Sequence, residues 1–306
     1  DEVEHKGHSL SWGEWAIVSD DPIFHGSGNS SQGGEIYHAA PDLDHSNKDV
    51  RLALVDWINY LKTDIGFSGW RFDFAKGYPP VYTEEYVRSS VGKESFCVGE
   101  IWTSCGYGPS GLNDQQDKHR QGLVDWVDAT KGSAAAFDFT TKAILQEAVK
   151  DQLWRLRDAS GRPAGMLGWW PNRAVTFLDN HDTGGTQNHW PFPMEHIGQG
   201  YAYILTHPGI PCVFWDHLFK YGKDITPLIK ARKTAQVKAE SRVVIRAAES
   251  DFYLAEITGD AGSLLVKLGS RLNMGSLAPG KAYKLYTSGK NYAVWMALRS
   301  DSASQN

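Results

Sequence analysis

Residues 49–74 read DVRLALVDWINYLKTDIGFSGWRFDF, and this stretch predicts one helix followed by one short strand. The apolar residues of its first part recur at near-helical spacing, namely Leu52, Val55, Trp57, Ile58 and Leu61. Gly66 stops this pattern, as a residue suited to the end of a helix. The segment GWRFDF (69–74) then has the length and composition of a buried strand.

The alternation of helix and strand continues through most of the chain. Further strands are expected at 96–102, 134–139, 173–179 and 211–215, and helices near 82–91, 118–128, 141–156, 195–207 and 223–236. Strands that alternate with helices form parallel βα units, and no G-x-G-x-x-G motif follows any of these strands. The pattern therefore favours an α/β fold of the (β/α)8 TIM-barrel type over a dinucleotide-binding sheet.

We place the barrel portion at residues 49–240. The regions on either side of it differ from it in composition and in periodicity. Residues 1–48 are rich in Gly, Ser, Asp and His with little periodicity, which predicts an irregular excursion. Residues 241–299 contain short alternating strands separated by turn signals, which predicts an antiparallel β-domain. Residues 300–306 read as a polar tail.

Charge and composition exclude several classes of protein. The 31 Lys and Arg against 36 Asp and Glu give a formal net charge of -5, and no cluster of positive charge suits a nucleic acid. No apolar run approaches the roughly 20 residues that span a bilayer. Cys97, Cys105 and Cys212 form no C-x-x-C pair and are expected to be free thiols. We expect a monomer with neither nucleic-acid nor membrane partners.

Three acidic residues, Asp73, Glu100 and Asp182, follow predicted strands, where barrel enzymes carry their chemistry. The period of two places Arg71 on the same face as Asp73, and its positive charge keeps this carboxylate ionised, as a nucleophile requires. Glu100 has apolar neighbours in the sequence, which favour the neutral acid that a proton donor requires. A glycosidase needs two carboxyl groups tuned in these opposite directions.

Position alone leaves other assignments open. Asp138 and Asp179 also follow predicted strands and are equally good candidates on composition. A single Asp at a strand end is also commonly a helix cap or an ion-pair partner. His181 has a structural role as its alternative.

Three motifs, GWRFDFAKGY (69–78), VGEIW (98–102) and FLDNHD (177–182), resemble the second, third and fourth signature segments of the α-amylase family of retaining glycoside hydrolases. Other stretches resemble the plant branch of that family, among them HAAPDLDH (38–45), FDFTTKAIL (137–145) and GWWPNRAVTF (168–177). The resemblance extends over almost the whole chain.

The resemblance implies a role for each of the three carboxylates. Asp73 matches the nucleophile that forms a covalent glycosyl-enzyme, and Glu100 matches the general acid and base. Asp182 matches the carboxylate that binds sugar hydroxyls and stabilises the oxocarbenium-like transition state, so Asp179 is expected to be structural. Further positions match supporting or substrate-contacting residues of the family, namely Arg71, Lys76, Gly77, Trp102, His181, His189 and Trp190.

The resemblance also implies structural Ca2+ in the excursion, where carboxylate and carbonyl oxygens are the ligands that this ion prefers. The matching ligand positions are Asp42, the backbone carbonyls of Ala40 and Gly77, and, more weakly, Asp21. Gln32 and Ile36 stand where two further ligands would fall, so the number of ions stays open and at least one is expected.

Surface features are also implied. Trp169 and Trp170 match a tryptophan pair with which cereal members bind starch at their surface, with simple packing as the alternative. A second surface site of one cereal form uses a tyrosine and a histidine; this chain has Leu272 and Ser288 there, so that site is expected to be absent. Asn29 begins an N-glycosylation sequon, which matters only in a secreted protein.

The first signature of the family, Asp-x-x-x-Asn-His, does not occur in this chain. The resemblance places residue 1 inside the excursion between barrel strand three and its helix, so the chain would hold strands four to eight. Five strands cannot close an eight-stranded barrel, and the chain is therefore expected to be a fragment.

These matches predict an enzyme that hydrolyses internal α-1,4 bonds of starch and related glucans with retention of anomeric configuration. Two alternatives stay open: a transglycosylase or branching enzyme of the same family, and an inactive glucan-binding remnant. Because no targeting segment is present in this chain, a plastid and a secreted location both stay open.

Overall fold

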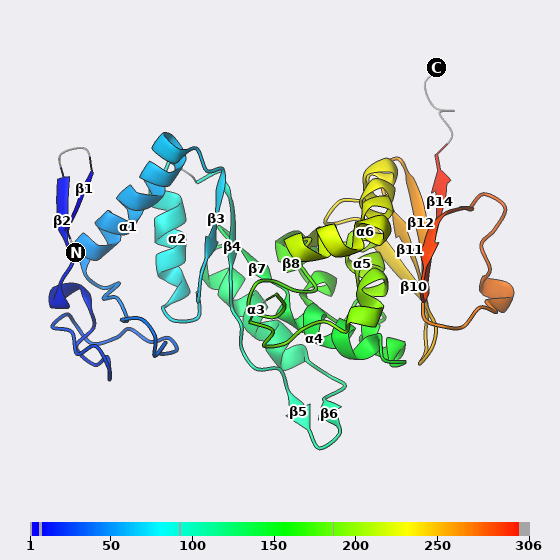
Figure 1. Ribbon diagram of the computed structural model, residues 1–306, viewed down its shortest axis with the longest axis horizontal. Coiled ribbons are helices and arrows are strands. Elements are labelled where there is room, and N and C mark those ends of the chain that lie inside the picture. The colour runs from blue at the N-terminus through cyan, green and yellow to red at the C-terminus, as the bar shows by residue number, and fades with distance from the viewer. Residues whose placement is uncertain (1, 6–7, 92, 186, 300–306) are drawn as a thin grey trace. The chain divides into compact units, whose positions relative to one another are not determined.

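The computed structural model describes residues 2–5, 8–91, 93–185 and 187–299 (Figure 1). The chain falls into two compact units. Unit 1 comprises Asp1–Trp102 and Asp125–Ala136, and unit 2 comprises Thr103–Val124 and Phe137–Asn306. Within the ranges described, no helix combines the length and apolar character that a membrane span requires. The predicted polar tail, residues 300–306, lies outside the described residues.

Unit 1 begins with a β-hairpin that the sequence pattern did not predict. β1 (Glu2–His5) pairs antiparallel with β2 (His8–Ser11). The rest of the predicted excursion has little regular structure, with a 3-10 turn at Glu14–Ala16 and an isolated bridge between Ile17 and Leu43. The expectation of an irregular region was therefore wrong for the hairpin, whose strands are too short to show a clear period of two.

The helix expected after residue 48 forms as α1 (Lys48–Tyr60). The side chain of Asn47 caps its N-terminus by accepting a hydrogen bond of 2.9 Å from the backbone N–H of Asp49. The last turn widens into a π-helical turn, Leu61–Ile65, which ends at Gly66 with φ of 93°. Glycine adopts this left-handed conformation without strain, so the predicted stop signal is confirmed.

Parallel strands follow in the predicted order. In unit 1, β3 (Gly69–Phe72) pairs with β4 (Phe96–Gly99), and β4 pairs with the start of β7 (Ala135–Phe137); α2 (Pro80–Ser89) connects β3 to β4. Trp126 of α3 (Asp117–Ala129) packs on Gly99, where a Cβ atom would lie 2.3 Å from the indole. Only glycine therefore fits directly before Glu100.

Unit 2 carries a further parallel pair, β8 (Ala174–Thr176) and β9 (Ile210–Pro211). The strand predicted at 211–215 was wrong in its extent, because α6 already begins at Trp215; periodicity alone cannot assign so short an apolar run. The helices of this unit include α4 (Phe139–Ala148), α5 (Ile197–Thr206) and α6 (Trp215–Ala235). Shorter elements are the hairpin of β5 (Tyr107–Gly108) and β6 (Gly111–Leu112) and the 3-10 turns Leu153–Leu156, Met166–Gly168, Pro171–Arg173 and Met194–His196.

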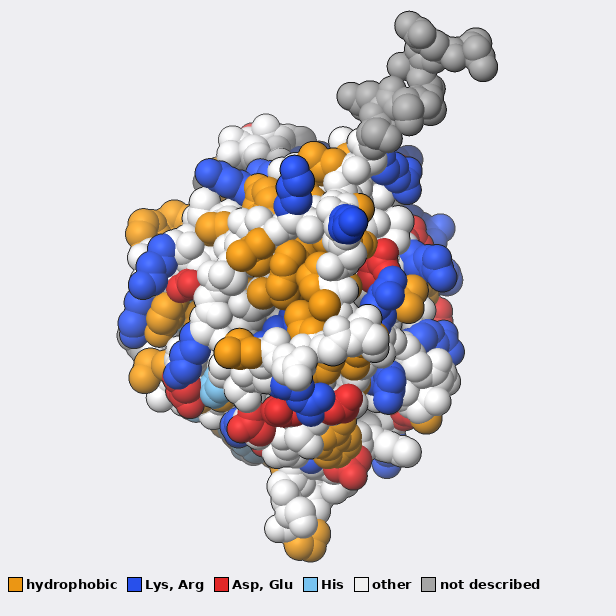
Figure 2. All heavy atoms as spheres, turned by 90° about the vertical axis from the view of Figure 1, so that its right-hand side faces the viewer, with side chains coloured by type: hydrophobic (Ala, Val, Ile, Leu, Met, Phe, Trp, Pro, Cys, Tyr) orange, Lys and Arg blue, Asp and Glu red, His pale blue; other side chains and the backbone are white. Residues whose placement is uncertain are grey.

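The C-terminal part of unit 2 is the predicted antiparallel sheet. Its strands are β10 (Arg242–Ala248), β11 (Tyr253–Thr258), β12 (Gly262–Leu268), β13 (Lys284–Gly289) and β14 (Tyr292–Leu298), in the order β10-β11-β12-β14-β13. On one face, Phe252 and Leu265 form a small core that Trp295 covers together with the loop containing a 3-10 turn at Gly275–Leu277. Figure 2 shows hydrophobic side chains gathered over this side of the molecule.

His207, directly after α5, connects that helix to the C-terminal sheet. It is fully buried, its Nε2 lies 2.8 Å from the hydroxyl of Tyr253, and its carbonyl accepts a hydrogen bond of 2.7 Å from Arg232. Burial lowers the pKa of His207 to about 3, with a smaller contribution in the same direction from Arg232 and an opposing backbone hydrogen bond to Tyr203. The imidazole is therefore neutral in the folded protein at neutral and mildly acidic pH.

Unit 2 is expected to lose stability as the pH falls below about 6.5, because unfolded His207 binds a proton there whereas folded His207 does not. At about pH 5 this single group lowers the free energy of unfolding by about 2 kcal/mol relative to neutral pH. His207→Asn should be less stable than the parent at neutral pH but should lose less stability on acidification. Urea unfolding at neutral and at acidic pH measures how much free energy of unfolding each protein loses on acidification. Equal losses in the parent and in His207→Asn would contradict the role given to this histidine.

Candidate active site

Arg71, Asp73 and Glu100 lie together in unit 1, at the carboxyl ends of β3 and β4. Nη1 of Arg71 forms an ion pair with Asp73, and Nη2 lies 2.9 Å from Oε2 of Glu100. The Asp73 side chain is 75% exposed, whereas that of Glu100 is 9% exposed. One guanidinium therefore joins an open carboxylate to a nearly enclosed one.

The backbone fixes Glu100 at this place. Its N–H donates to the carbonyl of Phe72 at 3.0 Å, and its carbonyl accepts from the N–H of Ala75 at 3.0 Å. The N–H of Phe74 lies 3.3 Å from Oε2 of Glu100. The apolar sequence neighbours of Glu100 did not reveal its charged partner, because the parallel register of β3 and β4 brings Arg71 beside it.

The segment after Asp73 is fastened to the irregular region. Nζ of Lys76 lies 2.7 Å from Oε1 of Glu35 and 5.0 Å from the centre of the Phe74 ring. Gly34 approaches so closely that a Cβ atom there would lie 2.1 Å from the carbonyl oxygen of Gly77. A sugar that binds Lys76 must therefore compete with Glu35, and the substrate contacts of Lys76, Gly77 and the half-buried Trp102 stay predictions.

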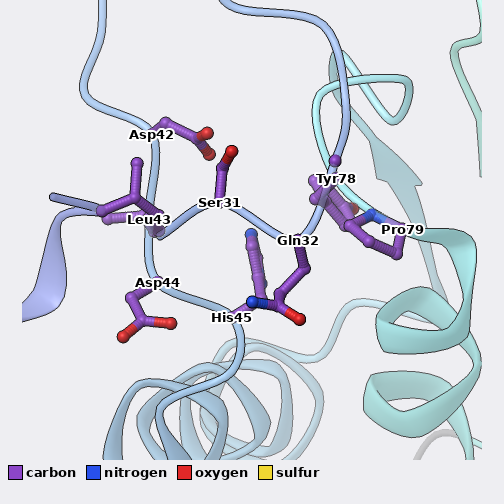
Figure 3. A pocket seen from close by; sticks show the side chains of 10 residues that line it. Ser31, Gln32, Asp42, Leu43, Asp44, His45, Tyr78 and Pro79 are labelled. Carbon is purple, nitrogen blue, oxygen red and sulfur yellow. The ribbon is translucent and has the colours of Figure 1, made fainter. Parts of the chain in front are cut away.

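The irregular region holds a small pocket lined by Ser31, Gln32, Asp42, Asp44 and Tyr78, among others (Figure 3). Desolvation, followed by repulsion from the nearby acidic side chains, raises the pKa of Asp42 to about 6. These neighbours are Asp21, Asp20 and Asp44. The pocket is therefore rich in negative charge.

Two of the predicted calcium positions differ in how they are held. Asp21 is buried and accepts backbone hydrogen bonds, including one of 2.9 Å from the N–H of Asp42. Ala40 is exposed, and its N–H donates to Tyr37 at 3.3 Å. In the part of the chain that the structure describes, no three His, Cys, Asp or Glu side chains are spaced to hold a metal ion. Carbonyl oxygens would therefore have to complete a calcium site.

Asp182 lies in unit 2 on a loop that we call the Asp182 loop, residues 179–192. Its Oδ1 accepts a hydrogen bond of 2.8 Å from Gln187, and its Oδ2 lies 3.3 Å from Nε2 of His181. The side chain of Asn180 accepts hydrogen bonds from the backbone N–H groups of Asp182 and Thr183 at 3.0 and 2.8 Å. Asp182 is therefore fixed through both its backbone and its carboxylate.

The other predicted residues of this loop contact Gln187 and the backbone of the loop. Nε2 of His189 lies 3.1 Å from Oε1 of Gln187, and the N–H of His189 donates to the carbonyl of Asp182 at 3.0 Å. The N–H of Trp190 donates to the carbonyl of Thr183 at 3.0 Å. The structure thus brings His181, Asp182 and His189 together in unit 2, and Gln187 is a member of this group that the sequence motifs did not reveal.

The two competing carboxylates, Asp138 and Asp179, serve the framework of unit 2. Asp138 caps α4 by accepting from the N–H of Thr141 at 2.8 Å, and it also accepts from the N–H of Leu167 at 2.9 Å. Asp179 is buried and lies 3.0 Å from Nζ of Lys142. Both carboxylates are occupied by interactions within the protein, as expected of structural residues.

The tryptophan pair is only partly accessible. Trp169 and Trp170 are both half-buried, and the guanidinium of Arg120 lies 3.8 Å from the centre of the Trp169 ring. The starch-binding surface therefore stays a prediction. Leu272 is 89% exposed and Ser288 is exposed on β13, so neither position of the second surface site holds a ring or an imidazole.

The comparisons with known proteins agree with the motifs. Residues 234–296 match the family model described as the α-amylase C-terminal β-sheet domain. The chain is 49% identical over 296 residues to the probable α-amylase 2 of Arabidopsis thaliana, an alignment that covers 95% of this chain and 68% of that protein. It is 43% identical over 294 residues to the chloroplastic α-amylase 3 of the same plant, covering 94% of this chain and 32% of that protein.

A solved structure of an Anoxybacillus α-amylase shares the fold. It superposes with a TM-score of 0.61 at 15% sequence identity, covering 92% of this chain and 69% of that one. This likeness concerns the fold alone, whereas the identity to the plant proteins extends through the segments that carry the three carboxylates. The chain belongs to the α-amylase family of glycoside hydrolases.

Proposed function

We propose that this chain is the catalytic part of an enzyme that hydrolyses internal α-1,4 bonds of starch and related glucans with retention. The observation that carries the proposal is the bridge of Arg71 between Asp73 and Glu100. It brings two carboxylates, each from a different family motif, together in unit 1. Asp182 from the third motif supplies the supporting carboxylate in unit 2.

The chemistry follows from the environments of the two carboxylates. Exposed Asp73 attacks the anomeric carbon and forms an ester, while the bond to the leaving oxygen breaks and Glu100 gives that oxygen a proton. Glu100, now ionised, takes a proton from water, and the resulting attack on the ester releases the sugar with its original anomeric configuration. Arg71 contacts both carboxylates and so fixes their positions relative to one another.

We propose that β3, β4, β7, β8 and β9 are strands four to eight of a (β/α)8 barrel. The alternation of parallel strands and helices and the likeness to the Anoxybacillus α-amylase support this assignment. In such a barrel the carboxyl ends of the strands share one face, which is where the three carboxylates follow their strands.

The proposal is tested by incubating the purified protein with soluble starch. We expect new reducing ends, and proton NMR of the first products should show the α-anomer. Products that are longer or more branched than the substrate would instead indicate transglycosylation. Binding to starch granules without release of reducing ends would indicate a glucan-binding remnant and would contradict the proposal.

We propose a structural calcium ion held by the carboxylate of Asp42, the carbonyls of Ala40 and Gly77 and, less directly, Asp21. The residues fit such an ion: among the described residues no hydrogen-bond donor reaches the Asp42 carboxylate, and burial, followed by repulsion from nearby acidic side chains, raises its pKa to about 6. Hard oxygen ligands of this kind suit Ca2+. A bound ion would offset the repulsion and tie the irregular region to the segment after Asp73.

Calcium is expected to raise the unfolding temperature of the parent protein, and Asp42→Asn should abolish this increase. Without calcium the variant should be at least as stable as the parent, because it removes a carboxylate that repels Asp21 and Asp44. Thermal unfolding of the parent and the variant, each in EDTA and in excess calcium, gives the four unfolding temperatures to be compared. An undiminished calcium effect in the variant would contradict the ligand assignment.

The cellular location, the glycosylation of Asn29 and the oligomeric state are also proposals. A plastid or secreted location is supported only by the name of the chloroplastic relative and by the sequon at Asn29. The side-chain amide of Asn29 donates to Asp44 at 3.0 Å and to Ser46 at 2.9 Å, so a glycan there would displace both contacts. We propose that the enzyme acts as a monomer.

A further inference from the structure

Lys142 is a fully buried lysine whose ammonium group lies beneath the Asp182 loop. It stands on α4, in the otherwise uncharged stretch FTTKAIL, and its side chain is 0% exposed. Nζ donates to the carbonyl of Leu178 at 2.6 Å, to Oδ1 of Asp179 at 3.0 Å and to Oε1 of Gln146 at 3.0 Å. All three protons of the ammonium group therefore have acceptors.

These contacts reach both ends of the loop. Asp179 is its first residue, and Leu178 directly precedes it in the segment that follows β8. At its exit, the Gln146 side chain that accepts from Lys142 donates to the carbonyl of Pro191 at 3.0 Å. Nζ of Lys142 also lies 4.8 Å from the centre of the Trp190 ring, a distance at which a cation is attracted to an aromatic face.

Asp179 carries the same connection into the loop. Its Oδ1 accepts from the hydroxyl of Thr183 at 3.0 Å, and its Oδ2 accepts from the N–H of Phe192 at 3.0 Å. Nε2 of His217 on α6 lies 3.5 Å from Oδ2. The Lys142–Asp179 pair thus holds Thr183, which follows Asp182, and Phe192, which closes the loop.

An ion pair in this position is a poor source of stability. Desolvation lowers the pKa of Lys142 to about 8 although Asp179 opposes the shift, which shows that burial of the charge is costly. Apolar residues of similar volume often stabilise a protein as well as a buried ion pair does. What such a pair supplies instead is a fixed geometry, since every hydrogen bond of its two groups has a direction.

We propose that Lys142 is a positioning residue that holds both ends of the Asp182 loop and so sets the place of the Asp182 carboxylate. The inference rests on the proposed function only in the statement that Asp182 acts in glucan hydrolysis. The holding of the loop itself is independent of any substrate.

The test compares the parent with Lys142→Met, which keeps the length of the side chain and removes its charge and donors. Hydrogen exchange measured by mass spectrometry should be faster in peptides covering the Asp182 loop and unchanged in the C-terminal sheet. With soluble starch, kcat should fall about 10- to 100-fold while KM changes by less than about threefold, because a displaced carboxylate weakens mainly the transition-state contact. Lys150→Met, an exposed lysine just beyond the same helix, is the matched control.

The double variant Lys142→Met/Asp179→Asn separates positioning from stability. It no longer buries a lone carboxylate, so it should regain thermal stability relative to the single variant while its kcat stays low. Unchanged exchange in the loop, faster exchange throughout the protein, or a double variant with the kcat of the parent would each overturn the inference. A parent without activity but with faster loop exchange in Lys142→Met would refute the proposed function and still support the holding of the loop.

Discussion

Asp73→Asn should lower the release of reducing ends from soluble starch by about 10⁴-fold or more, because the covalent route then has no nucleophile. The amide is similar in size to the carboxylate and the parent side chain is 75% exposed, so the fold should not change. Binding of glucan should persist, since contacts with the rest of the sugar chain do not depend on the attacking oxygen. The decrease should therefore appear in kcat rather than in KM.

A matched control for Asp73→Asn is Asp56→Asn, which makes the same change at an exposed position of α1. Both variants should have the unfolding temperature of the parent. Reducing-end assays at saturating starch then compare three proteins of equal stability. Retention of more than about a tenth of the parental rate in Asp73→Asn would remove this residue from the mechanism.

The order of the parallel strands was predictable because the local pattern of apolar residues indicates each strand in turn. The short runs 69–74 and 96–102, each of which contains one acid near its end, correspond to β3 and β4. The stop at Gly66 follows from the φ value that only glycine tolerates easily. Strand length was predicted less well. In the run 211–215 only Pro211 belongs to β9, and α6 already begins at Trp215; apolar character alone does not mark that change.

The partners of the charged side chains were not predictable, because they are distant in sequence. Lys76 pairs with Glu35, 41 positions away, and Lys142 pairs with Asp179, 37 positions away. Contacts between residues this far apart in the chain produce no periodic pattern in the sequence. One signal was nevertheless available: a lysine within an uncharged apolar stretch, as at Lys142, indicates a buried charge that needs a partner.

Arg71 is a second position where a large effect is expected, because its guanidinium contacts both Asp73 and Glu100. Arg71→Met leaves two carboxylates near each other without the cation that separates their charges. Without this cation the two carboxylates repel each other, and Asp73 loses the contact that holds it in place for attack. We expect kcat to fall about 100- to 1,000-fold.

Arg71→Lys should recover only part of this loss. A lysine ammonium is a single point charge, whereas the guanidinium of Arg71 uses two different nitrogens for the two carboxylates. Arg88→Met is the matched control, because it removes an arginine that pairs with Glu84 on α2, away from the strand ends. Initial rates on soluble starch across a range of pH compare the four proteins. Full activity of Arg71→Lys would show that charge alone suffices, and full activity of Arg71→Met would show that the bridge has no part in the reaction.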